Sequence, residues 1–286
     1  MNKNSVRGLL AAGLLLPLGV ASAAELAVAP AIDLAYKSSD FTIAFFGGSG
    51  TSLIKPSYTT LTPSLALNYG RFYGVAAYES TVDDWNSTSL EVSSPTSNSF
   101  IQQTFERNEA SLTFGYRVLD GSGKLGAVNV FAGYLQGVSG WNSTTFRYSA
   151  APAPVSIKNL NVNFNEKGLF VGANYSQPFG SKGTLSLSAA YGFLSGLLND
   201  VETSGGSSST NQDLYSKSNG LSVGLAWSGN LTGNMNYRVG LKYIKYNFDV
   251  DRIDDKLTGT STSVTPGMFV IKEQIYSLNF GVINYF

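Results

Sequence analysis

The sequence predicts an all-β fold, an antiparallel up-and-down β-barrel that crosses a membrane with its strands. Three observations predict it. Residues 276–286 alternate apolar with small or polar side chains, similar segments recur along the chain, and no apolar run approaches the roughly 20 residues that a transmembrane helix needs. Alternation of this kind turns one face of each strand toward lipid and the other toward a polar lumen. It also explains a mean hydropathy of only +0.02.

The first 23 residues have the parts of a secretory signal peptide. Lys3 and Arg7 supply positive charge, residues 9–20 are apolar, and residues 21–23 read Ala-Ser-Ala, which is a small-residue cleavage site. We therefore expect residues 1–23 to be removed and residues 24–286 to form a single transmembrane barrel domain. The chain has no cysteine, so neither a lipid anchor on a signal-peptide cysteine nor a disulfide framework is expected.

Rising and falling strands can be followed in order along the chain. Rising strands carry a tyrosine near the upper end, at Tyr36, Tyr78, Tyr134, Tyr191 and Tyr243. Falling strands end in an aromatic residue, at Tyr69, Tyr116, Tyr175, Trp227 and Phe286. The turns after the first four falling strands, at 70–71, 120–124, 179–183 and 228–233, contain glycine and mostly small polar residues, which favour tight turns.

These units predict ten strands, with short periplasmic turns and long extracellular loops near 83–103, 138–163, 196–216 and 249–270. Each strand has the 9 to 11 residues, approximately, that a tilted strand needs to cross the hydrocarbon. Twelve strands is the alternative, because residues 41–46 are also strand-like. That segment either extends the first strand or forms an additional short one.

The C-terminal strand resembles the closing strand of the outer-membrane β-barrel proteins of Gram-negative bacteria. It alternates in the same way and ends in Phe286, and Asn284 departs from the pattern, since an aromatic or aliphatic residue is usual there. The resemblance implies a place in the cell outer membrane, contact with its lipid and lipopolysaccharide, and a role for Phe286 as the signal read by the barrel-insertion machinery.

Charged residues are also expected inside the barrel, because they fall on the face opposite the tyrosines. They are Asp33, Lys37, Glu79, Glu109, Arg117, Arg238, Lys242 and Glu273. They either bridge and plug the lumen or line a narrow water-filled pore. The other residues of that face are small and hydroxyl-rich, such as Ser64, Ser111 and Ser188, which favours some water-filled space.

Lysines on the outward face form a second candidate site at the outer rim. Lys167, Lys217, Lys245 and Lys272 are predicted to lie just above the hydrocarbon, level with lipopolysaccharide phosphates. The alternative is that some of them belong to loops above the membrane.

A further repeat places Trp85 and Trp141 each seven residues after a girdle tyrosine, both followed by Asn-Ser-Thr. They are interpreted as interfacial tryptophans at equal height, or as a pair of carbohydrate-binding aromatics.

The amino-acid composition argues against an enzymatic function. The chain has no histidine and no cysteine, so no Ser-His or Cys-His relay can be assembled. A mechanism that uses two carboxylates remains chemically possible, and Asp83 and Asp84 are the obvious pair for it. However, adjacent residues in a solvated loop rarely converge on the same substrate atom. The carboxylates Asp249, Asp251, Asp254 and Asp255 could hold calcium, yet they do not fit an EF-hand loop and are interpreted as hydrated surface. No metal or cofactor is expected.

The function that the sequence favours is a narrow passive or facilitated channel for small polar solutes. Such a channel needs only the scaffold and a polar lumen. The alternatives are a surface-binding or adhesion protein that acts through its long loops, and a plugged barrel whose role is membrane integrity. Nucleic acid is not expected as a partner, because removal of Lys3 and Arg7 with the signal leaves 17 basic against 19 acidic residues.

Overall fold

The structure, a computed structural model, describes most of the chain beyond its N-terminal segment. The described residues are 26–45, 51–83, 85–94, 97–120, 126–149, 156–204 and 207–286. The predicted signal peptide and Asp84 lie outside these ranges. Within them, no helix is both long and apolar enough to cross a membrane.

The described chain is almost entirely β-strand, as its alternation of apolar with small polar residues predicts. In chain order the strands are β1 (Leu26–Phe45), β2 (Thr51–Ile54), β3 (Ser57–Tyr69), β4 (Phe72–Asp83), β5 (Trp85–Ser94), β6 (Ser97–Asp120), β7 (Ala127–Ser149), β8 (Ser156–Pro178), β9 (Thr184–Ser204), β10 (Ser207–Thr232), β11 (Met235–Asp255), β12 (Thr260–Ser263) and β13 (Phe269–Asn284). A short 3₁₀ helix, η1 (Gly180–Lys182), joins β8 to β9.

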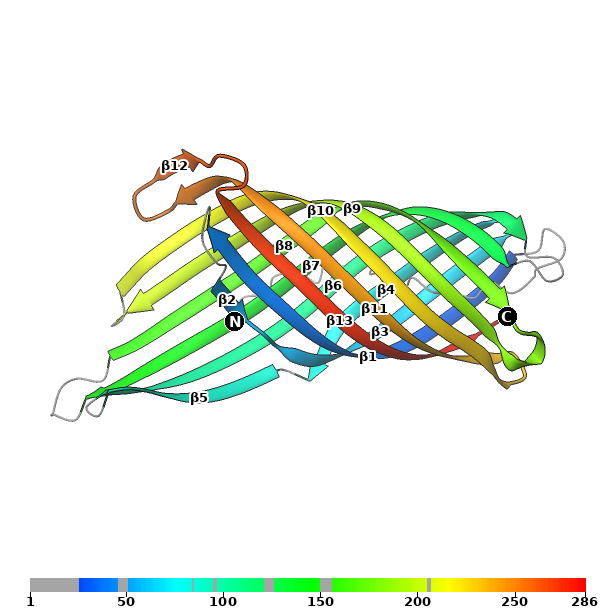
Figure 1. The fold of residues 1–286 in the computed structure, drawn as a ribbon, viewed down its shortest axis with the longest axis horizontal. Helices are drawn as coiled ribbons and strands as arrows, with labels where there is room; N and C mark the ends of the chain where they lie inside the picture. Colours follow the sequence, from blue (N-terminus) through cyan, green and yellow to red (C-terminus); the bar gives the residue numbers. More distant parts are fainter. Residues whose placement is uncertain are drawn as a thin grey trace, which may run out of the picture.

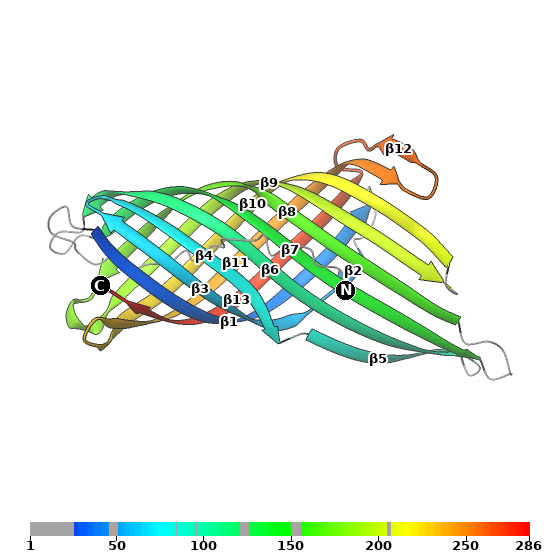
Figure 2. The ribbon, with the colours of Figure 1, turned by 180° about the vertical axis from the view of Figure 1, so that it is seen from behind.

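Ten of the described strands close into a ring in which all neighbours are antiparallel, as Figures 1 and 2 show from two sides. The order round the ring is β1, β3, β4, β6, β7, β8, β9, β10, β11 and β13, and β13 pairs again with β1. The short strands β2, β5 and β12 pair with β1, β6 and β11 and stand outside the ring. The up-and-down barrel is confirmed. Residues 41–45 extend β1 and add no strand to the ring.

Side chains alternate between an exposed outer face and a buried inner face. The girdle tyrosines Tyr36, Tyr78, Tyr134 and Tyr191 are 37% to 56% exposed. Aliphatic residues such as Leu65 and Leu169 are exposed on the same face. An exposed apolar band of this kind is what a lipid-facing barrel surface requires.

The strands differ in length, and the excess lies at one end. β6 to β10 contain 21 to 26 residues, whereas β3 and β4 contain 13 and 12. About 9 to 11 residues cross the hydrocarbon, so β6 to β10 continue well beyond it. We call this extension the upper wall. In Figure 1 it lies at the end where the β12 hairpin projects, opposite the C-terminus.

Much of the chain predicted as long loops is therefore strand. The upper wall contains most of 97–103, 138–149, 156–163 and 196–204. Val162 and Phe164 alternate with asparagines there, and Val162, Phe164 and Leu198 are at most 3% exposed, so the segments pair as hairpins with an apolar inner face. The opposite end has the short turns, and Gly70 and Gly233 adopt positive φ of 58° and 50° in two of them.

The C-terminal residue lies at the short-turn end and helps to close the ring. The Phe286 N–H donates to the Val28 carbonyl at 3.0 Å, and its side chain is 73% exposed on the barrel surface. The first and last strands are thus joined down to the final residue.

Candidate functional site

The inner face of the barrel holds the charged residues that alternation predicts for it. Asp33, Lys37, Glu79, Glu109, Arg117, Arg238 and Glu273 are each at most 8% exposed. Lys242 lies on the same face, between two residues of the outer wall, Leu241 and Tyr243. Charges in a space with little water are stable only when they are paired and hydrogen-bonded.

Arg107, which was not among the residues predicted from sequence, is the centre of a charge layer that it forms with Glu109, Glu166 and Glu273. Its guanidinium is fully buried. Through Nη1 it donates to Glu273 Oε1 at 2.7 Å and to Ser139 Oγ at 2.9 Å. Through Nη2 it donates to Glu109 Oε2 at 2.8 Å and to Glu166. Three strands of the ring separate β6 from β13, so Arg107 bridges the lumen.

Two more ion pairs join the inner face. Lys37 on β1 pairs with Glu79 on β4, and Arg238 on β11 pairs with Asp33 on β1. The alternation of side chains along each strand could have predicted that Arg107 and Glu166 face inward. Arg107, for example, lies two residues before Glu109 and therefore on the same face. Both were missed because the strands were expected to begin nearer the membrane.

An apolar layer covers the charge layer on the side of the upper wall. On three falling strands an apolar residue comes two positions before a charged one: Phe105 before Arg107, Phe164 before Glu166 and Ile271 before Glu273. Phe41, Trp141 and Phe248 complete the layer, with ring centroids 4.8 Å apart for Phe41 and Trp141 and for Phe164 and Phe248. All six are at most 3% exposed. Side chains in a water-filled lumen would be accessible, so the lumen is closed at this level.

Polar side chains fill the lumen on the other side of the charge layer. Asn129 donates to Asn174 at 3.3 Å, Ser176 donates to Asn174 at 2.9 Å, and the hydroxyls of Ser176 and Ser186 are 2.8 Å apart. These four residues are at most 8% exposed. The arrangement of small hydroxyl residues therefore corresponds to a packed, hydrogen-bonded interior rather than to a wide aqueous space.

Trp141 corrects the interpretation of the repeated Trp-Asn-Ser-Thr segments. Trp85 and Trp141 both pair with Phe105, so the two repeats do lie at equal height on either side of β6. The Trp141 side chain, however, is 2% exposed and packs in the lumen, not at the membrane surface. An interval of seven residues is odd, so Trp141 must point to the face opposite Tyr134. The Trp85 side chain lies outside the described part of the structure.

The rim lysines Lys167, Lys217, Lys245 and Lys272 all lie in strands and are exposed on the outer wall. Lys167 and Lys217 line one hollow of about 510 Å³. Arg252 and Tyr215 also line it, with the guanidinium carbon 3.8 Å from the ring centroid, and Lys217 Nζ lies 3.5 Å from Asp251. Three cations, from Lys167, Lys217 and Arg252, therefore line the hollow against two carboxylate residues, Asp251 and Glu166, which leaves a small excess of positive charge on the outer face of β8 to β11.

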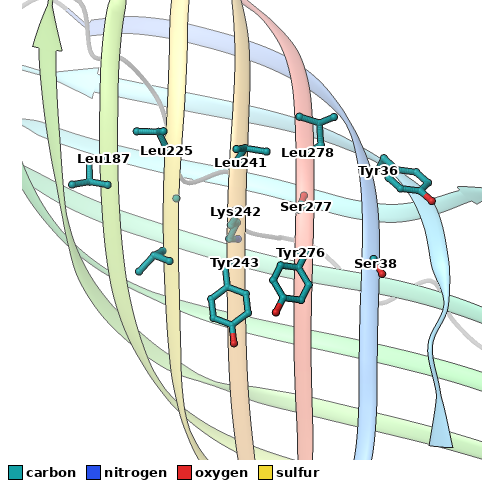
Figure 3. A pocket seen from close by; sticks show the side chains of 12 residues that line it. Tyr36, Ser38, Leu187, Leu225, Leu241, Lys242, Tyr243, Tyr276, Ser277 and Leu278 are labelled. Atoms are coloured by element: carbon teal, nitrogen blue, oxygen red, sulfur yellow. The ribbon is translucent and has the colours of Figure 1, made fainter. Parts of the chain in front are cut away.

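Lys245 does not line this hollow. A second hollow, an apolar groove of about 490 Å³, lies on the outer wall (Figure 3). Tyr243 and Tyr276 lie side by side in the groove with ring centroids 4.9 Å apart, and Leu225, Leu241 and Leu278 lie in a row beside them. Lys245 follows Tyr243 by two residues on the same outward face. The groove is part of the lipid-facing band and has the apolar lining of an acyl-chain contact.

The last two acidic residues of β11, Asp254 and Asp255, interact within the hairpin that β11 forms with β12. Asp254 accepts from Ser261 at 2.6 Å and pairs with Arg252 at 3.3 Å. The backbone N–H of Leu257 donates to Asp255 Oδ1 at 2.8 Å, and with the N–H of Thr258 it holds the pKa of Asp255 below its usual range. Asp249 and Asp83 are exposed, and Asp84 lies outside the described residues.

Comparison with known proteins gives likeness of fold alone. No protein-family model and no curated protein sequence matches the chain. The outer membrane protease OmpT from Escherichia coli superposes with a TM-score of 0.68 at 15% identity, over 91% of this chain and 97% of OmpT. The toluene transporter TodX of P. putida gives a TM-score of 0.35 at 10% identity, covering 90% of this chain and 89% of TodX. The translocator domain of NalP from Neisseria meningitidis gives 0.36 at 14% identity, covering 88% of each chain. The fold of this chain is that of the Gram-negative outer-membrane β-barrel proteins.

Proposed function

We propose that this chain is a closed outer-membrane barrel that acts as a surface-binding protein through its upper wall. The observation that carries the proposal is the burial of Arg107 and of the apolar layer above it, because an open pore would leave such side chains in contact with water. The upper wall, in contrast, presents a broad strand surface beyond the membrane. This supports the surface-binding alternative over the solute channel that the sequence favours.

A solute channel would require both layers to move. Arg107 would have to leave the carboxylates of Glu109, Glu166 and Glu273, and the packed aromatic rings would have to separate. Breaking a buried ion pair without replacement is unfavourable by about 3 to 5 kcal/mol, so spontaneous opening is expected to be rare.

Single-channel conductance of the refolded mature protein in a planar bilayer tests the proposal. The gel shift between heated and unheated samples is measured on the same preparation, because it reports barrel closure independently. We expect a closed barrel without stable current steps, while a porin of known conductance gives steps in the same bilayer. Stable ohmic steps from the closed barrel would contradict the proposal and restore the channel.

Catalysis is not part of the proposed function, although OmpT, with the same fold, is a protease. The absence of histidine and cysteine from all 286 residues removes the relays that outer-membrane barrel enzymes resembling this chain employ. Incubation with a mixture of unstructured peptides is expected to give no cleavage products by mass spectrometry.

Lipopolysaccharide phosphate is the partner that we propose for the rim lysines. Lys167, Lys217 and Arg252 concentrate three cations around the hollow on the outer wall. Lys217→Glu with Lys167→Glu is expected to lower the unfolding temperature in lipopolysaccharide but not in its dephosphorylated form. Lys182→Glu, at the short-turn end, is the matched control. Equal effects in the two lipids would contradict the phosphate contact.

A further inference from the structure

The outward face of β8 changes chemistry in distinct steps along its length. Nearest the short-turn end it is apolar and exposed, with Leu169, Val171 and Tyr175. Lys167 follows. Beyond it the next four outward residues are exposed asparagines: Asn165, Asn163, Asn161 and Asn159. We call these four residues the amide ladder.

The amide ladder is a true strand face, because the residues between its members point inward. Val162, Phe164 and Glu166 are at most 3% exposed, whereas the four asparagines are exposed. The Asn163 Nδ2 group donates to Asn161 Oδ1 at 3.0 Å, which aligns two neighbouring amides. Side chains on one strand face recur about every 6.8 Å, so the ladder presents donors and acceptors at a regular interval.

Neighbouring strands widen the ladder into a polar surface. Asn142 on β7 pairs with Asn161 and is exposed on the same face. Glu106 on β6 and Asn163 on β8 flank Gly140, where an added Cβ would lie 3.3 Å from Glu106 Oε1 and 3.4 Å from Asn163 Oδ1. Glycine at this position therefore lets the exposed carboxylate and the exposed amide approach each other over the strand between them.

This chemistry suits sugar hydroxyl groups. A carboxamide offers a carbonyl acceptor and two N–H donors, and a hydroxyl both donates and accepts, so each amide can bond a hydroxyl in either sense. An anionic ligand would find no cation among the amides, and Glu106 adds a carboxylate acceptor. An apolar ligand would leave the amides without partners, which is unfavourable.

The lower end of the ladder is continuous with the cationic hollow. Asn165 lines the hollow together with Lys167, Lys217 and Arg252. The order along β8 is thus apolar band, cations, amides. A membrane glycolipid has the same order of acyl chains, phosphates and sugars from the membrane outward.

We propose that the amide ladder binds the sugars of the outer-leaflet glycolipid whose phosphates occupy the cationic hollow. The proposal rests on the proposed function of the upper wall as a binding surface and names the ligand for it. It adds a carbohydrate site to a phosphate contact, and Asn165 is the residue that the two sites share.

The test compares two glycolipids and one triple variant. Dissociation constants are measured for refolded full-length mature protein with lipopolysaccharide that carries its core sugars and with lipopolysaccharide trimmed to the phosphorylated disaccharide. We expect wild type to bind the sugar-bearing form about tenfold more tightly, which corresponds to a few net hydrogen bonds. N159A/N161A/N163A, which leaves Asn165 and the cations intact, should lose this preference and retain its affinity for the trimmed form.

Asn234→Ala at the short-turn end is the matched control and should behave as wild type. Equal affinity of wild type for the two glycolipids would overturn the proposal, and so would a preference that survives in the triple variant. Binding of an unrelated soluble glycan without preference for the sugar-bearing lipid would also overturn it. Because none of these outcomes depends on conductance, failure here is distinguishable from failure of the closed-barrel proposal.

Discussion

Asp33 on β1 and Arg238 on β11 form a buried ion pair that passes over Gly281 on the strand between them. Gly281 is the paired neighbour of both residues. An added Cβ at Gly281 would overlap the Asp33 carboxylate, so the ion pair requires glycine there. The last strand of the chain thus permits a contact between two strands that are not adjacent.

Gly281→Ala is therefore expected to destabilise the barrel by about 1 to 3 kcal/mol, the usual range for overpacking an interior. Urea unfolding in detergent micelles, followed by tryptophan fluorescence, measures it. Gly192→Ala is the matched control, because a Cβ there would meet nothing nearer than 3.7 Å. In the D33S background the effect of Gly281→Ala should shrink. An equal effect in both backgrounds would mean that the Asp33 carboxylate is not the group that Gly281 accommodates.

Arg107→Met should destabilise the protein by about 3 to 5 kcal/mol, because it leaves Glu109, Glu166 and Glu273 buried without their cation. Neutralising two carboxylates in the triple variant R107M/E166Q/E273Q should recover most of the loss. The measurement is the free energy of unfolding of the three proteins. If the triple variant is no more stable than Arg107→Met, packing of the guanidinium rather than its charge stabilises the layer.

The sequence was sufficient to predict the ring and the face that most of the named residues occupy, although Trp141 was assigned to the membrane interface and lies in the lumen. Parity assigned Tyr36 to the lipid and Asp33 to the lumen, because a strand reverses its side chains at every residue. It could not show that Phe164 and Trp141 lie in one layer, since they are on different strands and their heights depend on the register of β7 with β8. Register across a ring is fixed by contacts that no single strand reveals.

The closed state of the lumen was likewise beyond the sequence. Small residues such as Ser186 suggested space, but Ser186 packs against Ser176, with the two hydroxyls 2.8 Å apart. Further up the lumen, the long side chain of Arg107 is fully buried among carboxylates from other strands. The cationic hollow was partly predictable. Lys167 and Lys217 were identified by parity, whereas Arg252 was not, because the β10 and β11 register shifts near Ser216.

Trp141 should be shielded from lipid, because its side chain is buried in the lumen. A protein that retains only this tryptophan, W85F/W227F, should show weak quenching by brominated acyl chains and weak quenching by acrylamide. The matched protein W85F/W141F retains Trp227, which follows the outward residue Leu225 by two positions, and should be quenched by brominated lipid. Strong lipid quenching of Trp141 would place it on the outer wall and contradict the apolar layer.

Asp255 should make the turn after β11 sensitive to acid. Its carboxylate accepts from the backbone N–H groups of Leu257 and Thr258, which lowers the pKa in the folded hairpin. A group with a lowered folded pKa stabilises above its unfolded value, about 3.9 for Asp, and this contribution is lost as pH falls through the folded pKa. The protection factors of the Leu257 and Thr258 amides, which compare exchange with the intrinsic rate at each pH, should fall below that range. Asp255→Asn should remove this pH dependence, and an unchanged fall in that variant would assign it to another carboxylate.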